Sequence, residues 1–204
     1  MTDMANLPAS GLPTQWLVLG ETKSGKTTFA AALERILGAH GPVGVYEAGS
    51  WVRRGFAHTP QAQQYTDEFD PAFKNALTEF ALTALRANPL VSFEAYEAWA
   101  QATKPEVAVI VGIRNPDDFI RVTQRAQRSV VLRLEPARKH TGALGQLEKG
   151  LEVIDAYLAW KESLGFPQLS LVPVSRDLIF ASDEQISTHL RPHFAPAPSS
   201  AQTL

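Results

Sequence analysis

The chain has 204 residues, of which 45% are apolar, with 19 basic and 21 acidic side chains and no cysteine. This length fits one domain with a substantial core, or one domain that carries an inserted lid. The absence of cysteine excludes disulfides, zinc–thiolate sites, iron–sulfur clusters and thiol nucleophiles. A formal net charge of −2 provides no overall positive field, so any contact with nucleic acid needs a local basic patch.

The two ends of the chain differ in composition from the region between them. Residues 1–14 and 192–204 are small, polar or rich in proline, and we expect flexible tails around a single domain at 15–191. The N-terminus lacks a basic segment followed by an apolar one, so it does not resemble a secretory signal. No apolar run approaches the roughly 18 residues that span a bilayer. These features predict a cytoplasmic protein (in the host cytoplasm if viral) with no membrane partner.

Between the tails, short apolar runs alternate with helical patterns. We expect strands at 16–19, 43–46, 107–111, 130–134 and 178–180. Helices are expected at 27–37, 71–87, 92–102, 117–127 and about 147–165, and after residue 180. Asp70 and Ser92 are the predicted helix caps. This alternation predicts an α/β fold with three layers and a mostly parallel central sheet.

One motif carries a specific chemistry. Residues 20–27 read G-E-T-K-S-G-K-T, which satisfies the phosphate-loop pattern directly after a predicted strand and at the start of a helix. Its glycines let the backbone curl so that N–H groups point inward at a helix N-terminus. Lys26 supplies a charge for the β- and γ-phosphates, and Thr27 a hydroxyl for Mg²⁺. The predicted Mg·ATP site comprises Gly20, Glu21, Thr22, Lys23, Ser24, Gly25, Lys26, Thr27 and Thr28.

Other segments narrow the class of phosphate-loop protein. The chain has no N-K-x-D segment of the kind with which GTPases read the base. The strand at 107–111 runs into Gly112-Ile113-Arg114, whereas a motor or AAA-type ATPase strand ends in Asp or Asp-Glu. The remaining class is the small-molecule and nucleotide kinases, in which catalysis is positioning and charge neutralisation.

Four segments in order carry a resemblance to a known family. They are the phosphate loop, Y-E-A-G-S at 46–50, V-I-V-G-I-R at 109–114 with the acidic pair Asp117-Asp118, and D-L-I-F-A-S-D at 177–183. With these segments the sequence resembles the P-loop nucleotide kinases, which include thymidylate kinase-like proteins, and most closely phage deoxynucleoside monophosphate kinases. The resemblance implies a helical acceptor region at about 50–103 and a lid at about 135–168.

The resemblance also implies roles for individual side chains. They are Glu47, Arg53 and Arg54 at the acceptor, Arg133, Arg138 and Lys139 in the lid, and Ser182 and Asp183 at the adenine. Arg138 is expected to offset charge on the transferred phosphoryl group. Arg114 follows the 107–111 strand, where ligands gather in open α/β sheets, so we expect it to contact the acceptor as well. We interpret Asp117 and Asp118 as residues that complement a helix dipole and have no catalytic role.

The sequence departs from the family pattern at two positions. Gly112 stands where the family often has an aspartate that helps to arrange metal or acceptor, and Glu47 stands where monophosphate kinases tend to have a neutral residue. A glutamate at the end of the second strand also resembles the deoxynucleoside kinases. A carboxylate that takes the proton of a hydroxyl acceptor is worth about 10²–10⁴-fold in rate, whereas a phosphate acceptor needs no base. We therefore predict a hydroxyl acceptor.

Three functions follow from these features. Some phage kinases of this general build phosphorylate the hydroxymethyl group of 5-hydroxymethyluracil within DNA, a step in thymidine hypermodification, and this is the acceptor we expect. Local patches that could meet DNA are Arg53-Arg54, Arg121/Arg125/Arg128 and Arg133/Arg138/Lys139/His140. The alternatives are a deoxynucleoside monophosphate kinase and, because of Gly112, a non-catalytic regulatory protein that binds a nucleotide.

Overall fold

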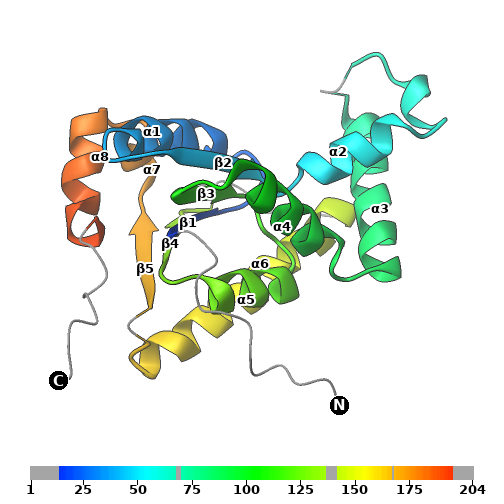
Figure 1. Cartoon of the computed structure of the whole chain (residues 1–204). Helices are drawn as coiled ribbons and strands as arrows, with labels where there is room; N and C mark the ends of the chain where they lie inside the picture. Colours follow the sequence, from blue (N-terminus) through cyan, green and yellow to red (C-terminus); the bar gives the residue numbers. More distant parts are fainter. Residues whose placement is uncertain (1–13, 68–69, 137–141, 167, 195–204) are drawn as a thin grey trace.

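The structure is a computed structural model that describes residues 14–67, 70–136, 142–166 and 168–194. Within these residues, five parallel strands form one sheet in the order β2-β3-β1-β4-β5 (Figure 1). The strands are β1 (Thr14–Leu19), β2 (Val43–Glu47), β3 (Val107–Val111), β4 (Ser129–Leu134) and β5 (Leu169–Val174). The central strand β1 pairs with β3 on one side and β4 on the other, so that Trp16 lies opposite Val109 and Val130.

Helices cover both faces of this sheet. They are α1 (Lys26–Gly38), α2 (Ser50–Ala57), α3 (Pro71–Ala87), α4 (Val91–Thr103), α5 (Pro116–Arg125), α6 (Gly142–Ser163), α7 (Arg176–Ile179) and α8 (Asp183–Leu190), with 3₁₀ turns at Ala62–Gln64 and Arg191–His193. Helices α1, α7 and α8 pack on one face, and α4, α5 and α6 on the other (Figure 1). The α2–α3 pair lies beside the sheet, beyond the end of β2. The predicted three-layer α/β architecture is confirmed.

The buried side chains form one cluster on each face of the sheet. In β1, Trp16 and Val18 belong to the cluster under α1, where Phe29 is also buried. Leu17 and Leu19 belong to the cluster under α4, α5 and α6. A parallel strand that is covered on both faces is apolar at every position, which is why these strands appear in the sequence as continuous apolar runs.

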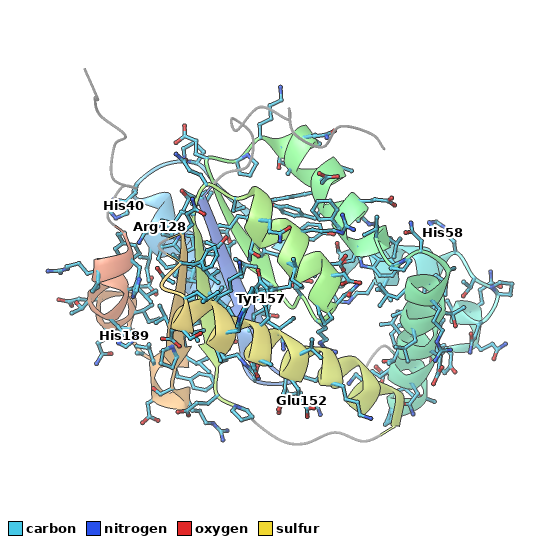
Figure 2. The ribbon with its side chains drawn as sticks, turned by 90° about the horizontal axis from the view of Figure 1, so that it is seen from below. His40, His58, Arg128, Glu152, Tyr157 and His189 are labelled. Carbon is cyan, nitrogen blue, oxygen red and sulfur yellow. The ribbon has the colours of Figure 1, made fainter. Side chains whose placement is uncertain are left out.

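Helix α6 passes close to the loop that follows β3. Tyr157 of α6, labelled in Figure 2, lies on the side of the helix that faces α5. Its ring packs edge-on against that of Phe119 of α5, with 6.1 Å between the ring centroids. Further toward its N-terminus, α6 contacts α3. A Cβ atom at Gly150 would lie only 1.9 Å from the carbonyl oxygen of Arg114. Most of the predicted lid is therefore a core helix, whose buried residues are Leu151, Ile154 and Leu158.

Two predicted helix starts have different outcomes. Asp70 caps α3 as predicted, because its side chain accepts a hydrogen bond from the Ala72 N–H and Pro71 occupies the first helical position. Ser92 was predicted to cap the next helix, but α4 already begins at Val91. Ser92 lies inside the first turn and is buried.

The fifth strand is the largest error of the sequence interpretation. Residues 178–180 do not form a strand, because Ser175 caps the short helix α7 by accepting a hydrogen bond from the Leu178 N–H. The strand lies earlier, at Leu169–Val174, and contains Pro173. It pairs only with β4, and an edge strand tolerates proline because one of its sides has no partner strand.

The boundaries of the domain also differ from the prediction. Thr14 belongs to β1, and residues 192–194 continue the fold, since the Phe194 ring lies 5.5 Å from that of Trp16. Residues 1–13 and 195–204 of the predicted tails lie outside the described residues. Helix α5 ends at Arg125, so Arg128 does not share a helix face with Arg121. No helix in the described part of the chain is long and apolar enough to cross a membrane.

The packing of α6 predicts a specific effect at Gly150. In Gly150→Ala the new methyl group collides with the backbone oxygen of Arg114, which cannot rotate away. We expect the free energy of unfolding to fall by about 1–3 kcal/mol or more in a denaturant titration. Gly38→Ala is the control, because a Cβ at Gly38 meets no atom within 4 Å, and it should change stability by less than about 1 kcal/mol. Equal stability of the two variants would contradict this packing.

Candidate functional site

The phosphate loop joins the carboxyl end of β1 to α1. Lys23 and Gly25 have left-handed backbone angles, with φ of 64° and 87°, and Ser24 is buried between them. The Ser24 N–H donates to the Glu21 carbonyl at 3.2 Å, which closes the turn. A Cβ at Gly25 would lie 2.8 Å from Cγ2 of Ile179, so α7 packs directly against the loop. Alternating backbone conformations of this kind direct N–H groups toward a bound anion.

The start of α1 has the features of an anion site. Its first turn has no side-chain cap and no acidic residue, so the positive end of the helix dipole is not offset locally. The Ser24 hydroxyl is buried and has no hydrogen-bond partner among the described residues. Together with the curled loop, these features fit the phosphate groups of a nucleotide.

Two cationic side chains lie at the loop. The Lys26 ammonium donates to the carbonyl oxygen of Glu21. Nη2 of Arg114, which follows β3, donates to the Thr22 hydroxyl at 2.8 Å. Gly112 has φ of 80°, and a Cβ there would lie 3.8 Å from Cε of Lys26. Gly112 therefore lies directly beside Lys26, in a backbone conformation that disfavours a side chain.

A cavity of about 1030 Å³ extends from the phosphate loop to α3. Among the described residues that line it, basic side chains outnumber acidic ones, and an apolar wall lies on the side of α3. The basic residues are Lys23, Lys26, Arg53, Lys74, Arg86 and Arg114, the acidic ones Glu47 and Asp118, and the apolar ones include Trp51, Val52, Phe73, Leu77, Leu82 and Leu85. A cavity of this size holds a ligand larger than the phosphates of one nucleotide.

Glu47 lies where the sequence placed it, at the carboxyl end of β2. It is in register with Val111 of β3, and both Glu47 and Lys26 line the cavity. Its Oε2 accepts from Nη1 of Arg53 at 2.8 Å, so two predicted acceptor residues form an ion pair with each other. Arg54, the third predicted acceptor residue, is exposed on α2 and does not line the cavity.

The apolar wall of the cavity is formed in part by one face of α3. Phe73, Leu77 and Leu85 recur at helical spacing on α3, but they are only half-buried because the cavity lies against them. Phe56 of α2 contacts Phe73 at 5.6 Å, which ties the two helices together. Helical spacing identifies a shared face but not what covers it, so the pattern in the sequence could not separate a core from a cavity wall.

Asp118 is the functional candidate that sequence reasoning missed. It was interpreted as a residue that complements the dipole of its helix; only 1% of it is exposed, and it lines the cavity. Burial raises its pKa to about 6, although the Ser92 hydroxyl, the Phe93 N–H and the Asn115 side chain favour the ionised form. Neither carboxylate oxygen has a hydrogen-bond partner of normal geometry among the described residues.

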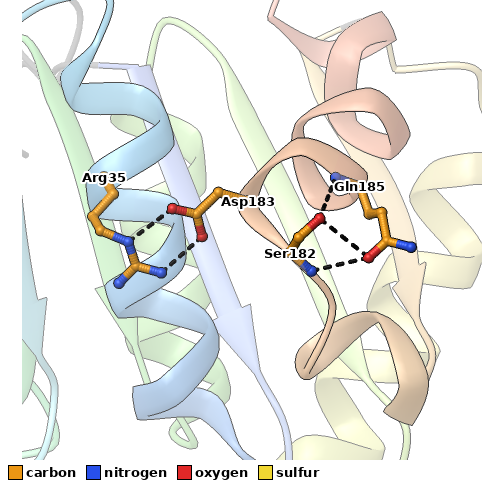
Figure 3. Close-up of polar contacts among 4 residues, drawn as sticks. All are labelled: Arg35, Ser182, Asp183 and Gln185. Atoms are coloured by element: carbon orange, nitrogen blue, oxygen red, sulfur yellow. Dashed lines mark hydrogen bonds and ion pairs between the residues drawn. The ribbon is translucent and has the colours of Figure 1, made fainter.

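Several other predicted residues have structural partners. Ser182 and Gln185 form a capping box at the start of α8, and Asp183 makes two hydrogen bonds to Arg35 of α1 (Figure 3). Neither Ser182 nor Asp183 lines the cavity. Arg133 is not in a lid: it lies in β4 and makes two hydrogen bonds, each of 2.8 Å, to Asp155 of α6. Arg138, Lys139 and His140 lie outside the described residues.

The described residues include no group of three or more His, Asp or Glu that could hold a metal by themselves. Mg²⁺ bound to nucleotide phosphates needs few protein ligands, since phosphate and water oxygens supply most of its shell. Thr27 lines the cavity at the first turn of α1 and is exposed there. Its hydroxyl is therefore the candidate ligand.

No family model and no curated protein matches the sequence. Among solved structures, an unliganded sugar kinase from Janibacter sp. HTCC2649 is similar with a TM-score of 0.43 and 16% identity, over 91% of this chain and 100% of that chain. Thymidylate kinase from Candida albicans is similar with a TM-score of 0.44 and 12% identity, over 89% of this chain and 90% of that chain. Because both similarities are distant, we infer the function from the residues of the site.

The buried carboxyl group predicts how stability depends on pH. The pKa of Asp118 is higher in the folded chain than its ordinary value of 3.8, so the folded state binds more protons between about pH 4 and 6. Its contribution to the free energy of unfolding is present below that window and is lost as pH rises through it, by on the order of 2 kcal/mol. In Asp118→Asn, the free energy of unfolding should no longer fall in this way between pH 4 and pH 7, as measured by denaturant titrations at the two pH values.

Asp117→Asn is the matched control for that experiment, because Asp117 is the exposed neighbour on the same helix. The control should retain the wild-type change in stability between pH 4 and pH 7. If wild type and Asp118→Asn showed the same pH dependence of stability, the raised pKa of Asp118 would be contradicted.

Proposed function

We propose that the protein is an ATP-dependent phosphotransferase that acts on a hydroxyl group of a nucleotide-type acceptor. The observation that carries this proposal is that Lys26 of the phosphate loop and the Glu47 carboxylate line one cavity. Phosphoryl transfer to a hydroxyl needs a cation at the transferred group and benefits from a base at the acceptor. The similarity to kinase structures is compatible with this reaction but is too distant to support it.

The phosphate loop and the start of α1 hold the phosphates of ATP, and Lys26 and Arg114 offset their charge. Mg²⁺, when bound with the nucleotide at Thr27, neutralises charge on the β- and γ-phosphates. Glu47 accepts the proton of the acceptor hydroxyl as its oxygen bonds to the γ-phosphorus. The bond from that phosphorus to the bridging oxygen breaks, and ADP leaves. Arg53 orients Glu47 through their ion pair.

The preferred acceptor is the hydroxymethyl group of 5-hydroxymethyl-deoxyuridine in DNA. The support for it is a carboxylate in the same cavity as the phosphate loop, together with an apolar wall on α2 and α3 against which a flat base can pack. A deoxynucleoside monophosphate is the second candidate, favoured by Lys74 and Arg86 on the acceptor side of the cavity, which suit an acceptor phosphate. The third is nucleotide binding without catalysis.

Transfer of label from γ-³²P-ATP to three acceptors tests the proposal. The acceptors are DNA containing 5-hydroxymethyluracil, a panel of deoxynucleoside monophosphates, and ordinary DNA with free nucleosides. We expect label on the modified DNA. Label on the monophosphates alone would show that the acceptor group is a phosphate and not a hydroxyl. Binding of ATP with no label on any acceptor would indicate a regulatory protein.

Lys26→Ala is the variant that ties this activity to the phosphate loop. We expect it to lose transfer by several orders of magnitude, because the charge at the β- and γ-phosphates is removed, while the fold is unchanged. Arg191→Ala removes a positive charge from an exposed position outside the cavity and should retain wild-type transfer. Full activity of Lys26→Ala would refute the phosphate-loop assignment.

Glu47→Gln tests the proposed base. It should lower kcat for a hydroxyl acceptor by about 10²–10⁴-fold and largely spare transfer to a phosphate, which needs no proton removed. Glu34→Gln, on the exposed side of α1, is the control and should behave as wild type. Equal losses with both kinds of acceptor would show that Glu47 acts through Arg53 or the shape of the cavity and is not a base.

A further inference from the structure

Positive charge is concentrated in the cavity, although the chain as a whole is slightly acidic. Among the described residues, six of the 19 basic side chains line the cavity, but only two of the 21 acidic ones do. Lys23, Lys26 and Arg114 belong to the phosphate loop or contact it. Lys74 and Arg86 lie away from the loop, on α3. A cavity lined mostly by one sign of charge attracts a ligand of the opposite sign, so we expect an anionic ligand on the α3 side as well.

The two basic residues of α3 stand at opposite ends of one face of the helix. Between them, lining residues recur every three or four positions, at Leu77, Ala81 and Leu85. Positions 74 and 86 are 12 residues apart, which is about 18 Å along a helix that rises about 1.5 Å per residue. Both basic side chains are exposed, whereas the three apolar ones are half-buried or buried. This wall of the cavity is therefore mostly apolar in the middle and positively charged at its two ends.

Two aromatic rings line the same cavity. Trp51 lies in the first turn of α2 and Phe73 in the first turn of α3, and both are half-buried. Proteins bind single strands by this combination, in which bases stack on aromatic rings and phosphates meet basic side chains. In a duplex the faces of the bases are covered by their neighbours in the stack. The wall therefore suits an unpaired strand.

We propose that the acceptor is a nucleotide within a single strand of DNA, and that this strand lies along α3. Lys74 and Arg86 contact two different phosphates of the strand, and Trp51 stacks on one of its bases. At about 3.4 Å per stacked nucleotide, the length of this wall corresponds to about five nucleotides. A free monophosphate has one phosphate group, which does not account for cations at both ends of the wall. This inference rests on the proposed function, which places the acceptor in this cavity.

A purely solvated role for Lys74 and Arg86 makes a different prediction. Exposed basic side chains on an amphipathic helix ordinarily face water and contact no ligand. Their removal would then affect DNA binding no more than removal of any other surface charge. If each neutralises a phosphate, its removal reduces the magnitude of the slope of log affinity against log salt by about 0.7 for a single strand. The salt dependence therefore separates the two roles.

The test is binding of a labelled strand to the full chain without ATP, followed by fluorescence anisotropy between about 50 and 200 mM salt. The probe is a single strand of about nine nucleotides with 5-hydroxymethyluracil at its centre. The double variant Lys74→Gln/Arg86→Gln should reduce the magnitude of the slope by about 1.4, because two phosphate contacts are lost. The control Lys104→Gln/Arg191→Gln removes the same charge from exposed positions outside the cavity and should keep the wild-type slope.

The stacking contact is tested by affinity at constant salt. Trp51→Ala should weaken binding of the strand by about 5- to 150-fold, because stacking on one base is lost, and should leave the slope unchanged. Trp51→Phe retains a ring and should recover most of this affinity. Equal losses in the two variants would show that Trp51 supports the shape of the cavity and would overturn the stacking contact.

Four results would overturn the strand site. They are no binding of the strand by wild type, an unchanged slope in Lys74→Gln/Arg86→Gln, a duplex of the same sequence that binds as tightly as the single strand, and an equal loss of affinity for the strand and for free 5-hydroxymethyl-dUMP in that double variant. The last result would place both cations at one acceptor phosphate.

Failure of the strand site is distinguishable from failure of the kinase, because binding is measured without transfer. Strand binding that depends on Lys74 and Arg86, in a protein that transfers no label, would reject the kinase and retain the strand site. Transfer of label to monophosphates by a protein that does not bind the strand would retain the kinase and reject the strand site.

Discussion

The parallel arrangement of the sheet is the constraint on which the candidate site depends. Because the strands run in the same direction, their carboxyl ends meet at one edge, and groups far apart in the sequence arrive there together. The phosphate loop follows β1, Glu47 ends β2, and Gly112 and Arg114 follow β3. The hydrogen bond from Arg114 to Thr22 connects two of these segments across 92 positions of the sequence.

The phosphate loop and the rest of the cavity at this edge of the sheet differ in charge. The loop and the start of α1 provide N–H groups and Lys26 without any acidic residue in the first turn. Among the described residues that line the cavity, the carboxylates are Glu47 and Asp118. Gly112 leaves the side of Lys26 without an acidic side chain.

The α2–α3 pair lies outside the layered core and supplies the apolar wall. Its own contacts are mostly aromatic, with Phe56 against Phe73 and Phe80. Helix α3 also contacts α6, which approaches the loop after β3 because residue 150 is a glycine. The width of the cavity at α3 therefore depends on contacts between helices rather than on the sheet.

Local sequence determined the features that depend on neighbouring residues. The phosphate loop, the Asp70–Pro71 helix start and the apolar runs of the buried strands follow from short-range pattern, and so does the α/β class. Tertiary structure decided what lies opposite each face. Burial of Asp118 and the cavity beside Leu85 depend on helices distant in sequence, and the Arg133–Asp155 pair joins β4 to α6. Periodicity shows which residues share a face, but only packing decides whether that face meets protein, solvent or a ligand.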